Sequence, residues 1–100
     1  MINFFETIAK YQGAWFSDVI GEPNGNPVII RVMNDVIAPF HTHETADEMF
    51  IVLSGTVFID TASNTKTLTA GQSHIVSAGI EHRARVEGRA ELIVIGGQNA

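Results

Sequence analysis

Residues 41–55 read HTHETADEMFIVLSG and carry the strongest signal in the sequence. Two histidines, His41 and His43, stand one residue apart, and Glu48 opens the apolar run that follows. In an extended chain, residues two apart point to the same side, so both imidazoles can reach one point in space. A carboxylate that opens an apolar strand either leans into solvent or is held by a partner, because an unpaired buried charge is costly.

Short runs rich in Val, Ile and Thr surround this stretch and alternate with turn residues. This composition is typical of β-strands. We predict strands at residues 28–33, 40–43, 48–53, 56–60, 65–69, 73–77, 82–86 and 90–95. Short strands at close, regular spacing indicate an all-β fold, and a jelly-roll barrel or sandwich is a natural option.

The amino-terminal part has a different pattern. Residues 4–11 predict a short helical turn, residues 14–20 an extended segment, and residues 21–27 a loop with two prolines and two glycines. A chain of 100 residues has the size of one domain, so we expect residues 1–100 to form a single domain.

The amino-acid composition disfavours two classes of partner, nucleic acids and membranes. The formal net charge is −5 and the six Lys and Arg residues are scattered, so no basic patch favours nucleic acid. The apolar runs are too short to span a membrane. The first residues lack a basic leader and carry Glu6 where a signal peptide needs an apolar run, so we expect a cytoplasmic protein. A small-molecule ligand or substrate is the expected partner.

Two spaced motifs carry a family resemblance. The pattern His41-Thr42-His43, four residues, Glu48, six residues, Gly55 resembles the first cupin motif. The pattern Gly71, five residues, Ser77-Ala78-Gly79, two residues, His82 resembles the second. Each motif is weak alone, but the pair in this order is strong. The chain therefore resembles small single-domain cupins over about residues 28–95, and the resemblance implies a cupin jelly roll.

Three positions depart from the family pattern. Asp35 stands in place of a glycine, Ser77 in place of a proline and Val86 in place of an asparagine. None of these is a metal ligand in the family, so the departures concern turn geometry more than metal binding.

The expected site is one divalent metal ion held by His41, His43, Glu48 and His82. Three imidazoles and a carboxylate suit a borderline ion such as iron, nickel, manganese, cobalt or zinc. A histidine pair alone is weak evidence, since such pairs are common on exposed strands. The resemblance implies an oxygenase or dioxygenase acting on a small molecule. The alternatives are a sugar or sugar-phosphate isomerase and a non-catalytic binding or sensing module.

Strand parity predicts the surroundings of this site. Phe50 and Val52 share the parity of Glu48 and are expected to form the wall of a substrate pocket. Arg31 interrupts an apolar run. It either neutralises a substrate carboxylate or lies at a surface or edge. His74 is expected on the outer face or at a subunit contact.

Two further features concern surfaces. Arg83 and Arg85 lie one and three residues beyond His82, so a regular strand points them away from the cavity into solvent. The aromatic-rich segment 4–16 either belongs to the core or covers a partner subunit. The resemblance to cupins implies dimers, so we expect a homodimer.

Overall fold

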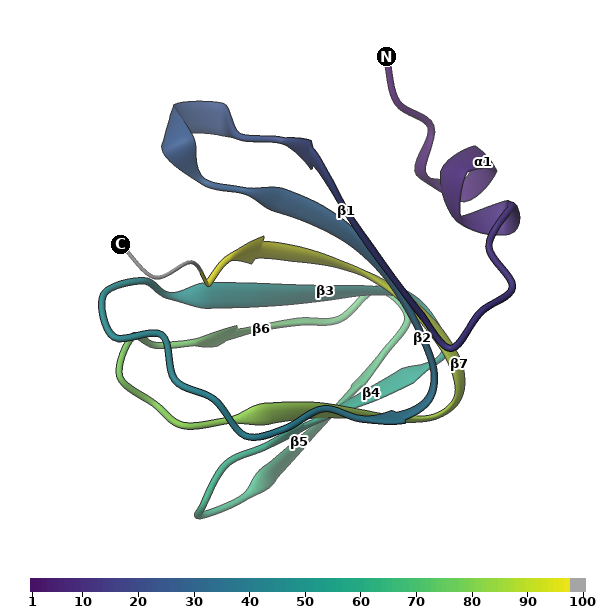
Figure 1. The fold of residues 1–100 in the computed structure, drawn as a ribbon. Helices are drawn as coiled ribbons and strands as arrows, with labels where there is room; N and C mark the ends of the chain where they lie inside the picture. The colour runs from purple at the N-terminus through teal and green to yellow at the C-terminus, as the bar shows by residue number, and fades with distance from the viewer. Residues whose placement is uncertain (98–100) are drawn as a thin grey trace.

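One long bent strand, β7 (Arg83–Gly96), joins the two layers of the fold in the computed structural model, which describes residues 1–97 (Figure 1). The remaining elements are α1 (Phe4–Ala9), β1 (Trp15–Gly21), the 3-10 turn η1 (Pro23–Gly25), β2 (Val28–Ile37), β3 (Glu48–Ser54), β4 (Thr56–Asp60), β5 (Thr65–Thr69) and β6 (Ser73–Val76). Within these residues, no helix has the length and hydropathy to span a bilayer.

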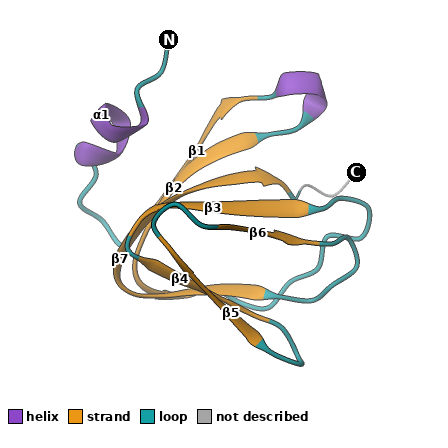
Figure 2. Ribbon diagram, turned by 180° about the vertical axis from the view of Figure 1, so that it is seen from behind, coloured by secondary structure: helices purple, strands orange, loops and turns teal. Residues whose placement is uncertain are grey.

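The strands pair antiparallel in the order β1-β2-β7-β3-β6, and β4 pairs with β7 and β5. The first part of β7 lies between β4 and the end of β2, and its later part lies between β2 and β3. Both β2 and β7 therefore pass from one layer to the other, and the two layers face each other (Figure 2). The all-β jelly-roll prediction is confirmed.

A β-bulge bends the pair β2–β7 where the layers meet. Asn34 pairs with Arg89 and Val36 with Val86, so Asp35 alone opposes two residues of β7. Asp35 has a φ of 50°, and its carboxylate accepts a hydrogen bond of 2.7 Å from the Gly88 backbone N–H. Aspartate tolerates this left-handed conformation better than most residues. It thus replaces the glycine of the family pattern without loss of the turn.

The structure corrects three predicted boundaries. The segments predicted at 82–86 and 90–95 form one strand, because Gly88, which separates them, lies within the bulge and does not end the strand. The strand predicted at 28–33 continues to residue 37. Residues 40–43 are not a strand; His41 forms only an isolated bridge with His82. The helical turn at the start and the strand after it are confirmed.

Apolar side chains form two clusters, one on each face of the larger layer. The inner cluster lies between the layers and contains Met33, Phe50, Val52, Val57, Ile59, Leu68, Val76, Ala84, Val86, Ala90, Leu92 and Val94. The outer cluster lies under α1 and is centred on Ile8, Ile30, Val32 and Ile93. Asn3 caps α1 by accepting a hydrogen bond from the Glu6 N–H. Alternation along β2 thus separates a helix-covered face from the face that carries the site.

We predict that Gly55→Ala destabilises the fold far more than Gly71→Ala. Both glycines have positive φ, 79° and 87°, so both variants meet the same backbone strain of about 1–2 kcal/mol. Only at Gly55 would the new Cβ lie 2.3 Å from a carbonyl oxygen, that of Arg89; at Gly71 nothing lies within 4 Å. Overpacking adds about 1–3 kcal/mol. Urea unfolding should resolve the difference, and equal losses would contradict it.

Candidate metal centre

Backbone hydrogen bonds hold the two motif segments together. The His41 N–H donates to the His82 carbonyl at 2.9 Å, and the His82 N–H donates back at 3.0 Å. The Gly79 N–H donates to the His43 carbonyl at 2.9 Å. Residues far apart in the sequence are therefore fixed side by side at one end of the space between the two layers.

Glu48 is placed by its neighbours at the start of β3. The carboxylate of Asp47 accepts a 2.8 Å hydrogen bond from the Ala78 N–H, and the Asp47 carbonyl accepts a 3.0 Å bond from the Gly97 N–H. These contacts tie the start of β3 to both the second motif and the end of β7. Glu48 itself is only 6% exposed and points into the space between the layers.

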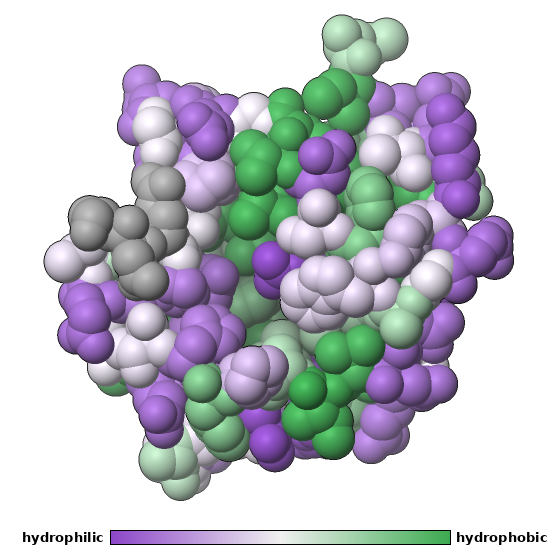
Figure 3. All heavy atoms as spheres, viewed as in Figure 1, coloured by the Kyte–Doolittle hydropathy of each residue, from purple (hydrophilic) through white to green (hydrophobic). Residues whose placement is uncertain are grey.

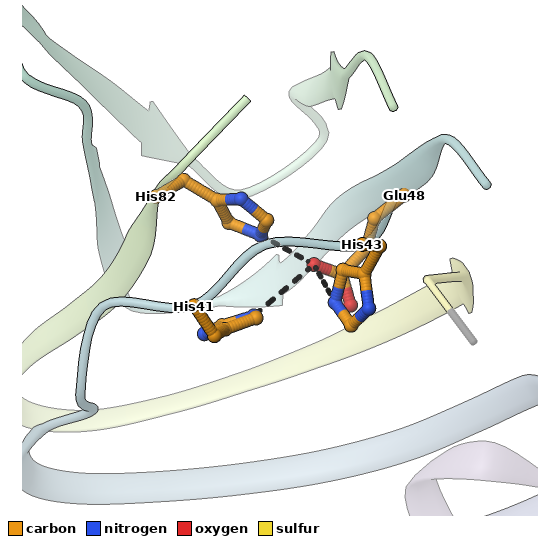
Figure 4. Close-up of side chains that lie close together, drawn as sticks. All are labelled: His41, His43, Glu48 and His82. Atoms are coloured by element: carbon orange, nitrogen blue, oxygen red, sulfur yellow. Dashed lines mark hydrogen bonds and ion pairs between the residues drawn. The ribbon is translucent and has the colours of Figure 1, made fainter. Parts of the chain in front are cut away.

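The four predicted ligands converge on one point (Figure 4). Their ligand atoms all lie within 4.8 Å of one another. Glu48 Oε1 lies 2.7 Å from His82 Nε2, 3.5 Å from His43 Nε2 and 3.8 Å from His41 Nε2. Two ligands on opposite sides of a metal, each at about 2.0–2.2 Å, are separated by a little less than this span. A small contraction would thus place all four around one ion.

The surroundings of His82 raise its pKa. Burial lowers the pKa of His82, but the hydrogen bonds to Glu48 and to the Ile80 carbonyl outweigh it and raise the pKa above the ordinary value. The Nδ1 atom lies 2.9 Å from that carbonyl and Nε2 lies 2.7 Å from Glu48 Oε1. The centre therefore stabilises positive charge between His82 and Glu48, where a divalent ion could replace the proton.

His43 gives the clearest indication that the centre binds a ligand. Both of its ring nitrogens are buried, and neither makes a hydrogen bond to the described residues. Buried polar atoms of this kind are rare in native proteins and call for a ligand. His41 Nδ1 lies 3.1 Å from the Pro39 carbonyl, which leaves Nε2 facing the centre. The donor set and its orphaned atoms fit a metal ion.

The centre is open on one side. The side chain of His41 is 39% exposed, whereas those of His43, Glu48 and His82 are 16%, 8% and 1% exposed. A ligand from solvent would reach the centre past His41.

Residues 28–96 match the family described as Cupin domain. The chain belongs to the cupin family. No curated protein sequence matches it.

Solved structures show the same fold. A cupin-2 domain containing protein from Shewanella frigidimarina is 27% identical, with a TM-score of 0.88 over 97% of this chain and 94% of that chain. Protein NMB1881 from Neisseria meningitidis is 23% identical, with a TM-score of 0.82 over 95% and 96% of the two chains. KdgF from Halomonas sp. is 13% identical, with a TM-score of 0.74 over 88% and 84%. The latter two show the cupin fold alone.

Sequence reasoning missed Gly97, which shapes the centre of this cupin. A Cβ at Gly97 would lie 2.3 Å from Glu48 Oε2, and Gly97 has a φ of 70°. The close approach requires the absence of a side chain at this position. The only signal was a Gly-Gly pair after an apolar strand, which reads as an ordinary strand end.

The residues predicted as pocket wall lie on the inner face. Phe50 is 1% exposed, and its ring centroid lies 6.1 Å from that of His82. Val52 is equally buried, within the inner cluster. Their role toward a substrate stays a prediction.

The predicted outward position of His74 is wrong. His74 pairs with Phe50 and Val76 with Glu48, so both side chains share the inner face. The neighbouring Ile75 instead lies on the outer face and is 53% exposed. The register of this short strand is set by pairing with β3, and its own apolar residue misled the assignment.

Arg83 and Arg85 point away from the centre, as predicted, but they are not simply solvated. Their Nε atoms donate to Asp60 Oδ2 at 2.9 and 3.0 Å, and Asp60 is 6% exposed. The hydrogen bond from Arg85 holds the pKa of Asp60 well below its usual range, although burial acts to raise it. The guanidinium groups also stack on Phe40 and Phe58.

Arg31 is not at a sheet edge. It lies on β2, between β1 and β7, and is half-buried on the inner face with Met33. Contact with a substrate carboxylate and a surface position both stay predictions for this residue.

We predict that His43→Ala and Glu48→Gln each weaken metal binding by about tenfold or more, since the first removes a donor and the second replaces the charged carboxylate with a neutral amide oxygen. His74→Gln is the matched control, because His74 is a histidine of the same inner face outside the cluster. Titration with Co²⁺, monitored by visible absorption, measures the affinity. Wild-type affinity in both cluster variants would rule out the assignment.

Proposed function

We propose that this cupin is a metal-dependent enzyme of the oxygenase or dioxygenase type that acts on a small molecule. The observation that carries the proposal is the His41, His43, Glu48 and His82 cluster, which is nearly buried yet open at His41. Its donor set suits iron, nickel, manganese, cobalt or zinc. A closed structural site would instead surround its ion on all sides.

The ion, when bound, would supply a Lewis acid and a meeting point for substrate and dioxygen. The protein prepares the ligands for it. The Pro39 and Ile80 carbonyls accept from the Nδ1 atoms of His41 and His82, which fixes the rings and aims each Nε2 at the centre. Four protein donors would leave two positions on an ion that prefers six.

The inner cluster would exclude water from one side of the reaction. Phe50 borders His82, and apolar side chains of β3 and β7 continue behind it. A dry wall strengthens electrostatic contacts with a bound substrate. Glu48 contributes one negative charge, so a divalent ion at this centre would keep a net charge of +1, which favours an anionic or enolic ligand.

A sugar-phosphate isomerase is the weaker alternative. A phosphate substrate needs several inward basic groups, whereas Arg83, Arg85 and Arg89 all pair with carboxylates. A non-catalytic binding or sensing module would use the same cluster, and only turnover separates it from an enzyme.

The test begins with element analysis of protein purified without added metal, followed by oxygen-uptake measurements with the identified ion and a panel of small acids and enols. We expect uptake that depends on both ion and substrate. Glu48→Gln should abolish it, and His74→Gln should retain it. Isomerisation of a sugar without oxygen uptake would favour the isomerase, and ligand binding without turnover would favour the sensing module.

A homodimer accompanies this proposal, with a second copy of the chain as the partner. Phe5 of α1 is 61% exposed, in the aromatic-rich segment singled out above. Covering such side chains stabilises association by about 25 cal/mol per Å² of apolar surface.

Light scattering at micromolar concentration should therefore show a dimer, and Phe5→Glu should shift it toward monomer. Ile37→Glu is the control, since Ile37 is 65% exposed but lies at the end of β2, away from α1. A monomeric wild-type protein would end the dimer proposal and leave the metal centre untouched.

A further inference from the structure

We infer that Arg31, together with Ser17 and Trp15, forms a carboxylate-binding subsite on the inner face beside the metal centre. The inference rests on the proposed function and specifies its substrate class: a small acid whose carboxylate meets Arg31 while a second oxygen group chelates the ion.

The sheet register places Arg31 on the face that carries the centre. Arg31 pairs with Leu92, which pairs with Val52, and both of these belong to the inner cluster. Val52 in turn shares the parity of Glu48 on β3. Figure 3 shows apolar side chains at the centre of the face that looks between the two layers, with hydrophilic side chains on either side.

The guanidinium of Arg31 lacks an anionic partner. Its Nε atom is buried and makes no hydrogen bond to the described residues. Its one hydrogen bond, from Nη2 to Ser17 Oγ, is long at 3.4 Å. Its Cζ atom lies 4.8 Å from the Trp15 ring centroid, which steadies the group without using its N–H donors. Most of its five donors are therefore available.

The other three arginines provide an internal comparison. Arg83 and Arg85 share Asp60, and Arg89 pairs with Glu91 at 3.0 Å and donates to two backbone carbonyls. Among the described residues, each of these three arginines has a carboxylate within 4.0 Å, whereas Arg31 on the inner face has none. A half-buried guanidinium without an anion is costly, and it cannot escape the cost by losing its proton.

Metal binding would increase this imbalance. Burial lowers the pKa of Arg31, and the charge of Glu48 acts in the opposite direction, so Glu48 is near enough to compensate Arg31 in part. An ion at the centre would take up that carboxylate charge. The inner face would then hold a net +1 ion and an uncompensated guanidinium. A ligand with two negatively polarised ends would satisfy both at once.

A carboxylate fits this subsite better than a phosphate does. The planar fork of one guanidinium matches the two oxygens of one carboxylate. A phosphate dianion needs more donors, and the neighbouring inward side chains of β2, Ile29 and Met33, are apolar.

The test compares 2-hydroxy diacids of increasing chain length, from malate onward, with the 2-hydroxy monoacids of equal length. Binding to Co²⁺-loaded protein is followed by visible absorption. In the wild type, the best diacid should bind about tenfold or more tightly than its monoacid, as a charge-assisted contact provides. Arg31→Met should erase that preference while Co²⁺ affinity stays unchanged. Arg83→Met, which removes an outward guanidinium, should keep it.

A second readout does not depend on the metal. The side-chain Nε–H resonance of Arg31 should shift when the diacid is added to the metal-free protein, and those of the other arginines should not. If Arg31→Met fails to fold, Arg31→Lys replaces it and should weaken the preference, since it keeps the charge but loses the fork.

The subsite is overturned if Arg31→Met keeps the diacid preference, if no diacid is preferred, or if inorganic phosphate displaces the diacid at lower concentration. Failure of the wild type to bind Co²⁺ contradicts the proposed metal centre instead, and the resonance of Arg31 then decides whether the carboxylate subsite exists without it.

Discussion

The reciprocal backbone hydrogen bonds between His41 and His82 are the constraint on which the centre depends. The segment 38–47 contains no strand, so this bridge is the contact that fixes the backbone of His41 directly, and the Ala38 N–H supports it by donating to the Ala84 carbonyl at 3.0 Å. The Gly79–His43 bond and the Asp47 contacts extend the same junction on both sides. Loop residues held at so few points stay in place only because the strands on either side, β2, β3 and β7, are rigid and heavily paired.

The bulge at Asp35 connects that junction to the fold as a whole. It bends β2 and β7 so that one end of each strand lies in the larger layer and the other end reaches β4. Without the bend, His82, the residue before β7, would not face Glu48 at the start of β3. Asp35 adopts the left-handed backbone conformation, and its carboxylate accepts a hydrogen bond from the Gly88 N–H. This one residue therefore both forms the turn and stabilises it.

Much of this could be predicted from sequence, for identifiable reasons. The four residues of the cluster were predicted because their spacing follows two motifs, and most strands were predicted because their β-branched residues are continuous. The strand at 40–43 was wrong because convergence of His41 and His43 comes from a loop held at His82, not from strand parity. The inward direction of His74 was missed because pairing with β3 sets the register of β6. Gly97 was missed because a close approach to Glu48 leaves no trace in a local pattern.

The described residues include two buried carboxylates with basic neighbours, Glu48 and Asp60, and the difference between them explains why one of the two is a candidate metal site. Asp60 is held by two guanidinium groups and by the Thr65 hydroxyl at 2.6 Å. Guanidinium groups stay protonated at any ordinary pH, so this cluster is saturated and cannot exchange its cations for a metal. Glu48 is held by imidazoles, which in their neutral form present nitrogen lone pairs to the same point. Asp60, with guanidinium neighbours, therefore belongs to an ion-pair cluster that stabilises the outer face. Glu48, with imidazole neighbours, belongs to a centre that can bind an ion. Arg31 belongs to neither group, because its charge faces inward without a carboxylate of the protein to meet it.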